Sequence, residues 1–362
     1  MPERKKTRTA TAGTVRLGSG YPVVIQSMTK TATTDIEKTL RQVRRLAAAG
    51  CGLVRIAVPT KADTQAFGKI AARSPVPLIA DIHFSPRRAI EAIEAGAGKI
   101  RLNPGNIKKR EDIERIIDCA KRHGTAIRIG VNEASIRDLK RDVAAGERVA
   151  LMLDEMTEYV RVFEKAGFEN LVLSAKSADT VRTIEANRAI SGRFDYPIHI
   201  GLTHAGLAED AIVSSSVAIG TLLAEGIGDT IRVSIAGDPV QEAEIAGQML
   251  LSLGLRESGR PQLVVCPTCG RCQSDVVGLA RKVRMILKKI HQPIRVAVMG
   301  CVVNGPGEAA DADVAVCAGA GKGFIYRKGK KVAAASEKDL PEALRKEIER
   351  LSGGLQGRQQ SQ

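Results

Sequence analysis

The sequence predicts an α/β protein in which an N-terminal TIM (β/α)₈ barrel is followed by a small α+β domain. Its 362 residues suggest roughly two domains. From residue 23 to residue 234, short apolar runs alternate with amphipathic segments, which is the pattern of strands that cross over through helices. Eight such units match a barrel, whereas a doubly wound sheet, the alternative, more typically stops at about five to seven strands.

Each of the eight expected strands is a short apolar run. They cover residues 23–28, 53–57, 77–81, 99–102, 126–131, 171–174, 198–202 and 230–233. The first expected helix begins at residue 36, where Thr34 and Asp35 can cap it, and ends in the small-residue stretch 47–50. The last helix of the barrel is expected at 240–253.

A polar stretch with Gly and Pro at 256–261 is typical of a linker. We therefore expect the barrel to occupy residues 1–255 and the second domain residues 256–352. The remaining residues, 353–362, are mostly Gly, Gln and Ser and are expected to form a disordered tail. In the second domain we expect strands at 263–265, 294–299, 313–317, 323–326 and 331–334, and helices at 275–289 and 340–351.

The composition is basic, with 55 Lys and Arg against 40 Asp and Glu, which gives a formal net charge of +15. This excess admits three partners: nucleic acid, an acidic membrane surface or an anionic small substrate. Aromatic residues make up only 3% of the chain, so the stacking platforms of single-strand binders are scarce. Two short basic runs, at 4–8 and 327–331, are interpreted as a solvated tail and a turn.

No apolar stretch approaches the roughly 18 residues of a membrane-spanning helix, and the first residues lack the apolar core of a signal peptide. We therefore expect a cytoplasmic protein with neither a membrane nor a nucleic acid as its partner. In that reducing compartment, closely spaced cysteines indicate a metal rather than disulfides.

Polar residues follow the apolar runs at the strand ends, where a barrel builds its active site. Five of the eight expected strands end with a cation, and Asp81 is the only acid among the strand-end residues. A buried Arg is costly without a carboxylate or phosphate partner, so these cations predict a site for a polyanion. The alternative is that each cation pairs with an acid on the barrel rim. The five cations are Arg55, Arg101, Arg128, Lys176 and Arg232, and Asn132 and Ser234 can add neutral donors.

The second domain carries cysteines spaced for a metal. Cys266, Cys269 and Cys272 stand three residues apart after an expected strand, and Cys301 follows another strand. Such spacing suits zinc or an iron–sulfur cluster, but a zinc ribbon would need a second C-x-x-C or C-x-x-H pair. The second element instead has one Cys, and its loop with Gly and Pro would bring Glu308 toward the same metal. Three thiolates and one weaker oxygen ligand would leave one iron displaceable by substrate.

Cys272 leaves three interpretations open: a ligand, a spare thiol beside the cluster, or a buried core residue. Cys51, Cys119 and Cys317 are expected to pack in the core. The Gly-rich segment 319–323 lacks the G-x-x-x-x-G-K-[ST] pattern, so we expect a turn there rather than a phosphate-binding loop.

These motifs resemble those of the 4-hydroxy-3-methylbut-2-enyl diphosphate synthase family of the non-mevalonate isoprenoid pathway. The most specific are Cys-Pro-Thr-Cys-Gly-Arg at 266–271 and Gly-Cys-Val-Val-Asn-Gly-Pro-Gly-Glu at 300–308. The likeness runs through nearly the whole chain, and the short linker resembles that of the two-domain bacterial type. The matching barrel motifs are Gln-Ser-Met-Thr at 26–29, Ala-Asp-Ile-His at 80–83, Arg-Leu-Asn-Pro-Gly-Asn at 101–106, Arg-Ile-Gly-Val-Asn at 128–132 and Glu-Gly-Ile-Gly-Asp-Thr-Ile-Arg-Val-Ser at 225–234.

The resemblance implies a [4Fe–4S] cluster held by Cys266, Cys269, Cys301 and Glu308. It implies a homodimer in which the cluster domain of one subunit closes over the barrel mouth of the other. The implied reaction is the reductive ring opening and dehydration of 2-C-methyl-D-erythritol 2,4-cyclodiphosphate to (E)-4-hydroxy-3-methylbut-2-enyl diphosphate, with two electrons from ferredoxin or flavodoxin. The implied substrate contacts are Arg55, Arg101, Arg128, Asn132, Lys176, Arg232 and Ser234.

We expect Glu308, Asp81 and His204 to act in catalysis, and His204 marks a departure from the family. Where the family usually has Thr-Glu-Ala-Gly, this chain has Thr-His-Ala-Gly at 203–206. His204 could replace the missing carboxylate as a proton donor, or it could contact the ligand while another residue acts as the acid. The rival hypothesis is a zinc-stabilised nucleic-acid-binding protein, which the single Cys of the second element and the scarce aromatics disfavour.

Overall fold

The computed structural model describes residues 3–82, 84–103, 106–107, 109–136, 143–203, 206–257, 259, 261–290 and 292–359. The chain divides into two compact units, Met1–Arg256 and Glu257–Gln362. Their boundary falls in the polar stretch that the sequence analysis interprets as a linker. No helix of the described residues is both long and apolar enough to cross a membrane.

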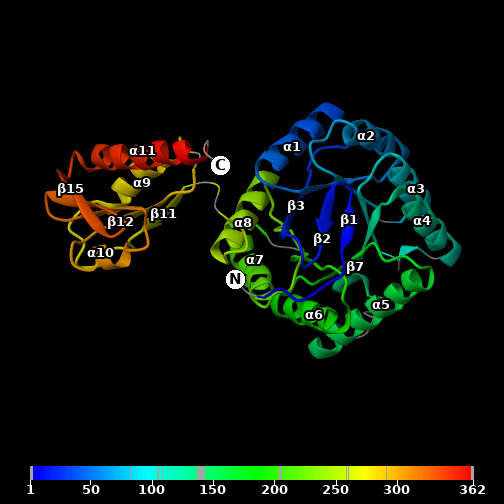
Figure 1. Ribbon diagram of the computed structural model, residues 1–362. Coiled ribbons are helices and arrows are strands. Elements are labelled where there is room, and N and C mark those ends of the chain that lie inside the picture. The colour runs from blue at the N-terminus through cyan, green and yellow to red at the C-terminus, as the bar shows by residue number, and fades with distance from the viewer. Residues whose placement is uncertain are drawn as a thin grey trace. The chain divides into compact units, whose positions relative to one another are not determined.

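The first unit is a parallel eight-stranded barrel surrounded by helices, as the sequence predicts (Figure 1). Neighbouring strands pair in the order β8-β7-β6-β5-β4-β3-β10-β9, and a bridge between Leu173 and Ile198 joins the two ends of the sheet. The doubly wound alternative is therefore wrong. The strands are β3 (Val24–Met28), β4 (Leu53–Ala57), β5 (Leu78–Asp81), β6 (Lys99–Leu102), β7 (Ala126–Asn132), β8 (Leu171–Lys176), β9 (His199–Ile200) and β10 (Thr230–Ile231).

Local sequence sets the ends of several barrel helices. The carboxylate of Asp35 caps the first helix by accepting a hydrogen bond from the N–H of Lys38, as predicted, and Thr60 and Asp63 form a capping box on the second. The fourth helix ends at Gly124, whose φ of 64° favours glycine. The helices are α1 (Ile36–Ala48), α2 (Lys61–Ala71), α3 (Pro86–Glu94), α4 (Arg110–His123), α5 (Ala145–Lys165), α6 (Thr180–Arg193), α7 (Ala208–Ala224) and α8 (Pro239–Ser252), with a 3₁₀ turn, η2 (Glu133–Ser135), after β7.

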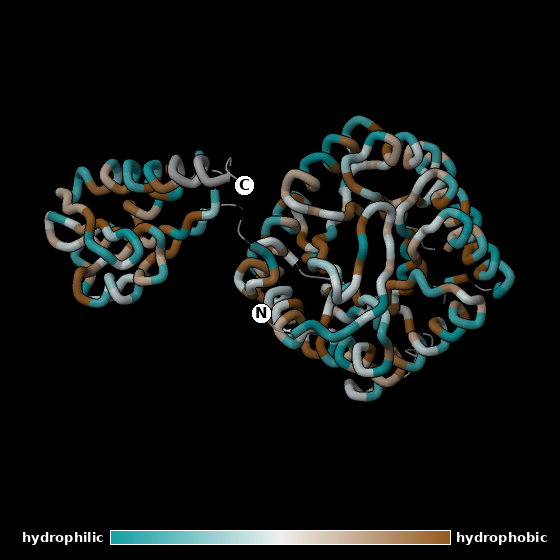
Figure 2. Tube along the Cα trace, viewed as in Figure 1, coloured by the Kyte–Doolittle hydropathy of each residue, from teal (hydrophilic) through white to brown (hydrophobic). Residues whose placement is uncertain are grey.

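Side chains alternate along each barrel strand between the helix layer and the lumen. Apolar residues such as Ile100 and Leu102 of β6 join a core shared with the helices. Figure 2 shows hydrophobic and hydrophilic stretches interspersed around the barrel. Lys99 and Arg101, which alternate with Ile100 and Leu102 along the strand, are also buried and therefore face the lumen. Polar side chains therefore fill much of a lumen that usually holds layers of bulky apolar ones.

A β-hairpin that the sequence analysis did not predict covers the N-terminal end of the lumen. Its strands, β1 (Ala10–Ala12) and β2 (Val15–Leu17), pair antiparallel through a turn at Gly13, whose φ is 62°. A Cβ at Gly13 would lie 2.8 Å from the Cβ of Pro77, so glycine is needed there. The hairpin closes this end with an apolar plug and leaves the opposite end for binding. The plug consists of Ala10, Ala12 and Leu17 packed against Leu53, Ile79, Ala126 and Val172 of four barrel strands.

The basic run at residues 4–8 is built into the barrel, so its interpretation as a solvated tail was wrong. Arg4 forms an ion pair with Asp229, whose side chain is only 3% exposed. Arg8 lies 2.9 Å from a carboxylate oxygen of both Asp195 and Glu169. The buried carboxylate of Asp229 needs a counter-charge, and Arg4 supplies it.

The second unit is an α+β module with a five-stranded mixed sheet. Two long helices pack on one face of the sheet through an apolar core, and a one-turn helix lies by the other face. Every strand and both long helices that the sequence predicts are present. In sheet order the strands are β11 (Gln262–Val265), β12 (Arg295–Met299), β13 (Val314–Ala318), β14 (Lys322–Arg327) and β15 (Lys330–Ser336), of which the first three are parallel. The helices are α9 (Val276–Leu287), α10 (Gly305–Glu308) and α11 (Leu340–Gln359).

Helix α11 runs past Leu351, where the sequence predicted its end. It continues to Gln359 through most of the expected disordered tail, and residues 360–362 lie outside the described part of the chain. Extending an existing helix by one residue fixes few dihedral angles for each new hydrogen bond, and the Leu, Gln and Arg of this segment are good helix formers.

Candidate active site

Five cationic side chains from five barrel strands meet at the carboxyl end of the lumen. Arg101 and Arg128 are neighbours across β6 and β7 and are only 5% and 3% exposed. Lys176 at the end of β8 is also buried, and Arg55 of β4 and Arg232 after β10 are half-buried. The charges of the arginines act on the pKa values of Arg55, Arg128 and Lys176, so the five residues form one group, here called the cation cluster.

Two members of the cation cluster have a carboxylate partner among the described residues. Asp81 Oδ1 lies 3.9 Å from Arg101 Nε. Glu242 of α8, which is 1% exposed, places Oε2 3.3 Å from Arg232 Nε and Oε1 3.3 Å from Lys30 Nζ. Glu242 was not predicted, because nothing in the sequence distinguishes it from Glu244, the other acid of the same helix.

The other three cations form no ion pair with a carboxylate among the described residues, although the charge of Asp81 acts on Arg55 and Arg128. Arg128 Nε and Nη1 have no hydrogen-bond partner in that part of the chain, and Arg55 Nε donates to the sulfur of Met28, 3.1 Å away. The neighbouring charges that act most strongly on the pKa of Lys176 all belong to arginines. Within the described ranges, the alternative that every cation pairs with an acid on the rim therefore holds for only two of the five.

Burial and mutual repulsion disfavour the protonated forms in the cation cluster. Burial lowers the pKa of Arg55 to about 10 and lowers the pKa values of Arg128 and Lys176 well below their usual range. The neighbouring guanidinium charges contribute to all three decreases, and the charge of Asp81 opposes them at Arg55 and Arg128. A polyanion in the lumen would relieve this repulsion and accept the unused hydrogen bonds, which a neutral ligand could not do.

The other predicted barrel residues lie at the same end of the lumen, with one exception. Asp81 ends β5, and Asn132 ends β7, where it aligns with Lys176 in the register of β7 and β8. Ser234 is half-buried and follows β10. His204 lies outside the described residues, so its expected role as a proton donor stays a prediction.

A second polar group, whose role the sequence analysis did not predict, lies one layer deeper in the lumen. Lys99 and His199 are fully buried, and neither Lys99 Nζ nor His199 Nε2 has a hydrogen-bond partner among the described residues. His199 Nδ1 lies 2.6 Å from Thr230 Oγ1. Gln26 is 1% exposed, and its side-chain amide likewise has no described partner. We call these four residues the lower lumen group.

Another buried acid, Glu133 in η2, organises the loop after β7. Its carboxylate lies 3.0 Å from Arg148 Nη1 and 3.2 Å from Arg182 Nε, and it accepts a hydrogen bond from Ser177. Burial raises the pKa of Glu133, but these three partners outweigh burial and bring the pKa below its usual value. The network ties the loop after β7 to α5, α6 and the end of β8.

The predicted metal ligands lie in the two segments that follow the adjacent strands β11 and β12 of the second sheet. Cys266 directly follows β11 and donates its N–H to the carbonyl of Val298, 2.9 Å away. Cys301 follows β12, the parallel neighbour of β11. Cys269 is exposed, Cys266 and Cys301 are half-buried, and Glu308 is exposed at the end of α10.

Backbone N–H groups favour the thiolate form of Cys301. Hydrogen bonds from the backbone of Asn304, Gly305 and Val303 lower its pKa below the usual value of a thiol. In the described part of the chain, no three His, Cys, Asp or Glu side chains gather closely enough to hold a metal ion. The ligand set therefore stays a prediction.

The remaining cysteines and the Gly-rich segment take ordinary structural places. Cys51, Cys119 and Cys317 are buried, as predicted. Cys272 is half-buried and its thiol donates to the carbonyl of Ser274, 3.2 Å away, which leaves its three interpretations open. Residues 319–321 of the Gly-rich segment form the predicted turn between β13 and β14, and residues 322–323 begin β14.

Comparison with known proteins decides the family. A family model described as the GcpE TIM-barrel domain matches residues 7–247, and one described as the GcpE protein C-terminal domain matches residues 262–350. The chain belongs to the GcpE family. The cation cluster lies in the first matched region and the four predicted metal ligands lie in the second.

GcpE-family relatives with similar sequences carry the name 4-hydroxy-3-methylbut-2-en-1-yl diphosphate synthase (flavodoxin), which confirms the resemblance drawn from the motifs. The Caldanaerobacter subterraneus protein is 44% identical over 96% of this chain and 98% of its own. The Aquifex aeolicus protein is 44% identical over 97% of this chain and 98% of its own. Among solved structures, Xanthomonas albilineans dihydropteroate synthase is 14% identical with a TM-score of 0.48, over 69% of this chain and 98% of its own, a likeness too distant to bear on function.

The donor chemistry of this GcpE-family chain fits an iron–sulfur cluster. Its thiols stand on loops that follow adjacent parallel strands, and the lowered pKa of Cys301 favours the thiolate that a metal requires. Glu308 comes after Cys301 in the chain and is the last residue of the one-turn helix α10. The residue types therefore suit the cofactor that the motifs imply, although the described side chains do not gather closely enough to hold it.

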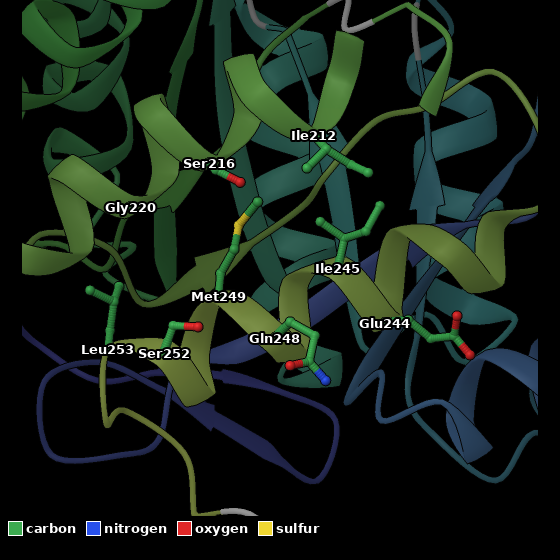
Figure 3. A pocket seen from close by; sticks show the side chains of 9 residues that line it. All are labelled: Ile212, Ser216, Gly220, Glu244, Ile245, Gln248, Met249, Ser252 and Leu253. Carbon is green, nitrogen blue, oxygen red and sulfur yellow. The ribbon is translucent and has the colours of Figure 1, made fainter. Parts of the chain in front are cut away.

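The GcpE-family barrel also has a cavity of about 520 Å³ outside the lumen, between α7 and α8. Figure 3 shows Ile212 and Ser216 of α7 facing Ile245 and Met249 of α8 across it. The lining is mostly apolar and contains no Lys or Arg. This cavity therefore does not suit a polyanion, and the lumen remains the candidate site.

Proposed function

We propose that this chain catalyses the reductive ring opening and dehydration of 2-C-methyl-D-erythritol 2,4-cyclodiphosphate to (E)-4-hydroxy-3-methylbut-2-enyl diphosphate. The reaction consumes two electrons and two protons and releases one water. The product corresponds to the name of the relatives. The observation that carries the proposal is the cation cluster, whose unbalanced charge suits a diphosphate.

The chain's own residues would bind and orient the substrate. Guanidinium groups donate paired, charge-assisted hydrogen bonds to phosphate oxygens, and Arg128 has two donor atoms without a described partner. Asp81 would keep Arg101 oriented toward the lumen. The proposed contacts are Arg55, Arg101, Arg128, Asn132, Lys176, Arg232 and Ser234.

We further propose that Cys266, Cys269, Cys301 and Glu308 hold a [4Fe–4S] cluster. When bound, such a cluster supplies one-electron transfer and a Lewis-acidic iron. The hydrogen bonds that favour the Cys301 thiolate support its part in this ligand set. Glu308 would be the weaker oxygen ligand.

In this proposal the electrons come from flavodoxin or ferredoxin, and the relatives' names, which specify flavodoxin, support the former. Asp81 or His204 would deliver a proton. The protein would act in the cytoplasm as a homodimer, with the second unit of one subunit serving the barrel of the other.

Turnover by anaerobically reconstituted protein tests the proposal. With the cyclodiphosphate and reduced flavodoxin, Arg128→Met should lower kcat/KM by at least about 30-fold, because losing charge-assisted bonds to phosphate costs about 2 kcal/mol or more. Arg115→Met, which changes an exposed arginine of α4, is the control and should have little effect. Protein that binds no iron, or that leaves the cyclodiphosphate unchanged, would refute the proposal.

Iron content tests the ligand set separately. Cys301→Ser should lose the cluster and its visible absorption. Cys272→Ser should keep both if Cys272 is a spare thiol, and should lose both if it is a ligand. Full iron content in Cys301→Ser would contradict the proposed set.

No observation favours the rival, a zinc-stabilised nucleic-acid-binding protein. Three of the five strand-end cations are buried in the lumen, where the backbone of a polymer could not reach them. Zinc without iron in the purified protein would be the result expected from the rival.

A further inference from the structure

Lys99 is a buried lysine that the proposed substrate contacts leave unused. It precedes Arg101 by two residues on β6, and its Nζ has no hydrogen-bond partner among the described atoms. Ile79 and Ala126, which align with Lys99 in the neighbouring strands, belong to the apolar plug. A fully buried ammonium group without a carboxylate partner among the described residues is costly.

Cations outnumber acids among the groups that share the lumen with Lys99. Burial lowers the pKa of Lys99 well below its usual value, and the charges of Arg128 and Arg55 lower it further. The hairpin on the other side contributes apolar side chains only. The charged and titratable groups that the described elements turn toward the lumen are Arg55 of β4, Asp81 of β5, Arg101 of β6, Arg128 of β7, Lys176 of β8, His199 of β9 and Arg232 after β10, with Glu242 of α8 beside Arg232.

Lysine, not arginine, is the group that can respond to this repulsion. A guanidinium keeps its proton in proteins, so the four arginines of the cation cluster stay charged. A lysine amine becomes neutral when it is buried. Lys99 and Lys176 can therefore relieve the repulsion by releasing their protons, and both can take them back when negative charge arrives.

We propose that a polyanion entering the lumen is accompanied by proton uptake at Lys99 and Lys176. Each proton moves from solvent to the lone pair of a neutral Nζ, and no other bond forms or breaks. The bound anion then faces two ammonium groups that were neutral amines in the free protein. The inference rests on the proposed function, because that function supplies the polyanion, a cyclic diphosphate.

Coupled proton uptake makes the affinity depend on pH. For each proton taken up, the affinity falls about tenfold per pH unit wherever the amine is neutral in the free protein and charged in the complex. Because protons are consumed on binding, the affinity must decrease as the pH rises. A binding site made of arginines alone would show no such slope.

Isothermal titration calorimetry of the full chain, without reductant, counts these protons. The binding heat is compared in HEPES and Tris, whose ionisation enthalpies differ, at the same pH near neutrality. Two ligands are titrated: the cyclodiphosphate and trimetaphosphate. Each phosphorus of either ring carries one strongly acidic oxygen, so neither ligand itself titrates near neutrality. The wild-type chain should take up about one to two protons.

Substitutions assign the protons. Lys99→Met should still bind both ligands but should take up about one proton fewer than the wild-type chain. Lys99→Gln, whose neutral amide can be buried, is a second variant that guards against misfolding of the first. Lys38→Met changes an exposed lysine of α1 and should leave the proton count unchanged.

The outcomes separate this inference from the proposed function. Binding of the cyclodiphosphate without proton uptake would overturn the inference and leave the proposed function standing. Uptake on binding trimetaphosphate, with no binding of the cyclodiphosphate, would support the inference and refute the proposed function. The inference also fails if neither ligand binds, or if both Lys99 variants keep the wild-type proton count.

Discussion

Replacing Glu242 by Gln removes a buried negative charge and barely changes the shape of the side chain. The carboxylate faces two cations, with Oε2 3.3 Å from Arg232 Nε and Oε1 3.3 Å from Lys30 Nζ. Gln keeps one oxygen but turns an NH₂ group toward one of these donors. The variant therefore leaves both Arg232 and Lys30 without this counter-charge at the mouth of the barrel.

The two lost ion pairs contribute unequally to stability. The side chain of Lys30 is 32% exposed and its ammonium also donates to the carbonyls of Ile235 and Gly237, so this pair contributes under about 1 kcal/mol. The side chain of Arg232 is only 13% exposed, and breaking so buried a pair costs about 3 kcal/mol or more. For a unit of this size, that loss corresponds to a decrease in Tm of about 6–12 °C.

Differential scanning calorimetry of the full chain can follow the barrel transition separately from that of the second unit. The matched control is Glu244→Gln, which changes an exposed acid of the same helix and should shift stability by under about 0.5 kcal/mol. A barrel Tm for Glu242→Gln within about 2 °C of the wild type would refute the reasoning, because Arg232 would then not depend on this carboxylate.

Three further substitutions test other parts of the fold. Gly305→Ala should destabilise the second unit by about 1–3 kcal/mol, because the added Cβ would lie 2.9 Å from the Cβ of Met299; an unchanged melting temperature for that unit would contradict this. Glu133→Gln should cost about 2 kcal/mol at neutral pH. Because the pKa of Glu133 is lowered, its contribution is present above the unfolded-state pKa and is lost as the pH falls through the folded-state pKa. Urea denaturation at about pH 7 and about pH 3 measures this, and a deficit of the same size at both would argue against it. Arg4→Ala should destabilise the barrel by about 3 kcal/mol, because the buried carboxylate of Asp229 loses its partner; a wild-type urea midpoint would show that Asp229 does not need it.

The barrel and its cation cluster could be predicted because both follow from strand periodicity. A parallel barrel strand is covered by helices on one face, so its apolar residues are easy to recognise in the sequence. A cation such as Arg55 or Arg128 within or just after such a run can point only into the lumen or toward its carboxyl end. The family motifs then linked these positions to a diphosphate, and the structure brings the five cations together.

Some residues could not be predicted from the sequence because their roles depend on their tertiary neighbours. Lys99 begins its strand, where a lysine is ordinarily solvated, and only the closed barrel with its plug makes the position fully buried. Glu242 is one of two acids in α8, and its role requires the approach of α8 to Arg232. The hairpin strands β1 and β2 are three residues each, too short to show a period of two.

The same electrostatic interactions in the lumen govern both the binding of an anion and the stability of the barrel. The apolar plug packs one end of the lumen, while the layers above it hold cations that the described carboxylates only partly balance. A polyanion that binds only the folded barrel adds stability by mass action, about 2.7 kcal/mol at a hundredfold excess over Kd. In the free barrel, buried Lys99 gives up the proton that it carries in the unfolded chain, which costs stability, and Lys99→Met removes that cost. Lys99→Met should therefore raise the Tm of the free barrel and reduce the further increase that a polyanion produces, whereas a variant that merely loosened packing would lower both.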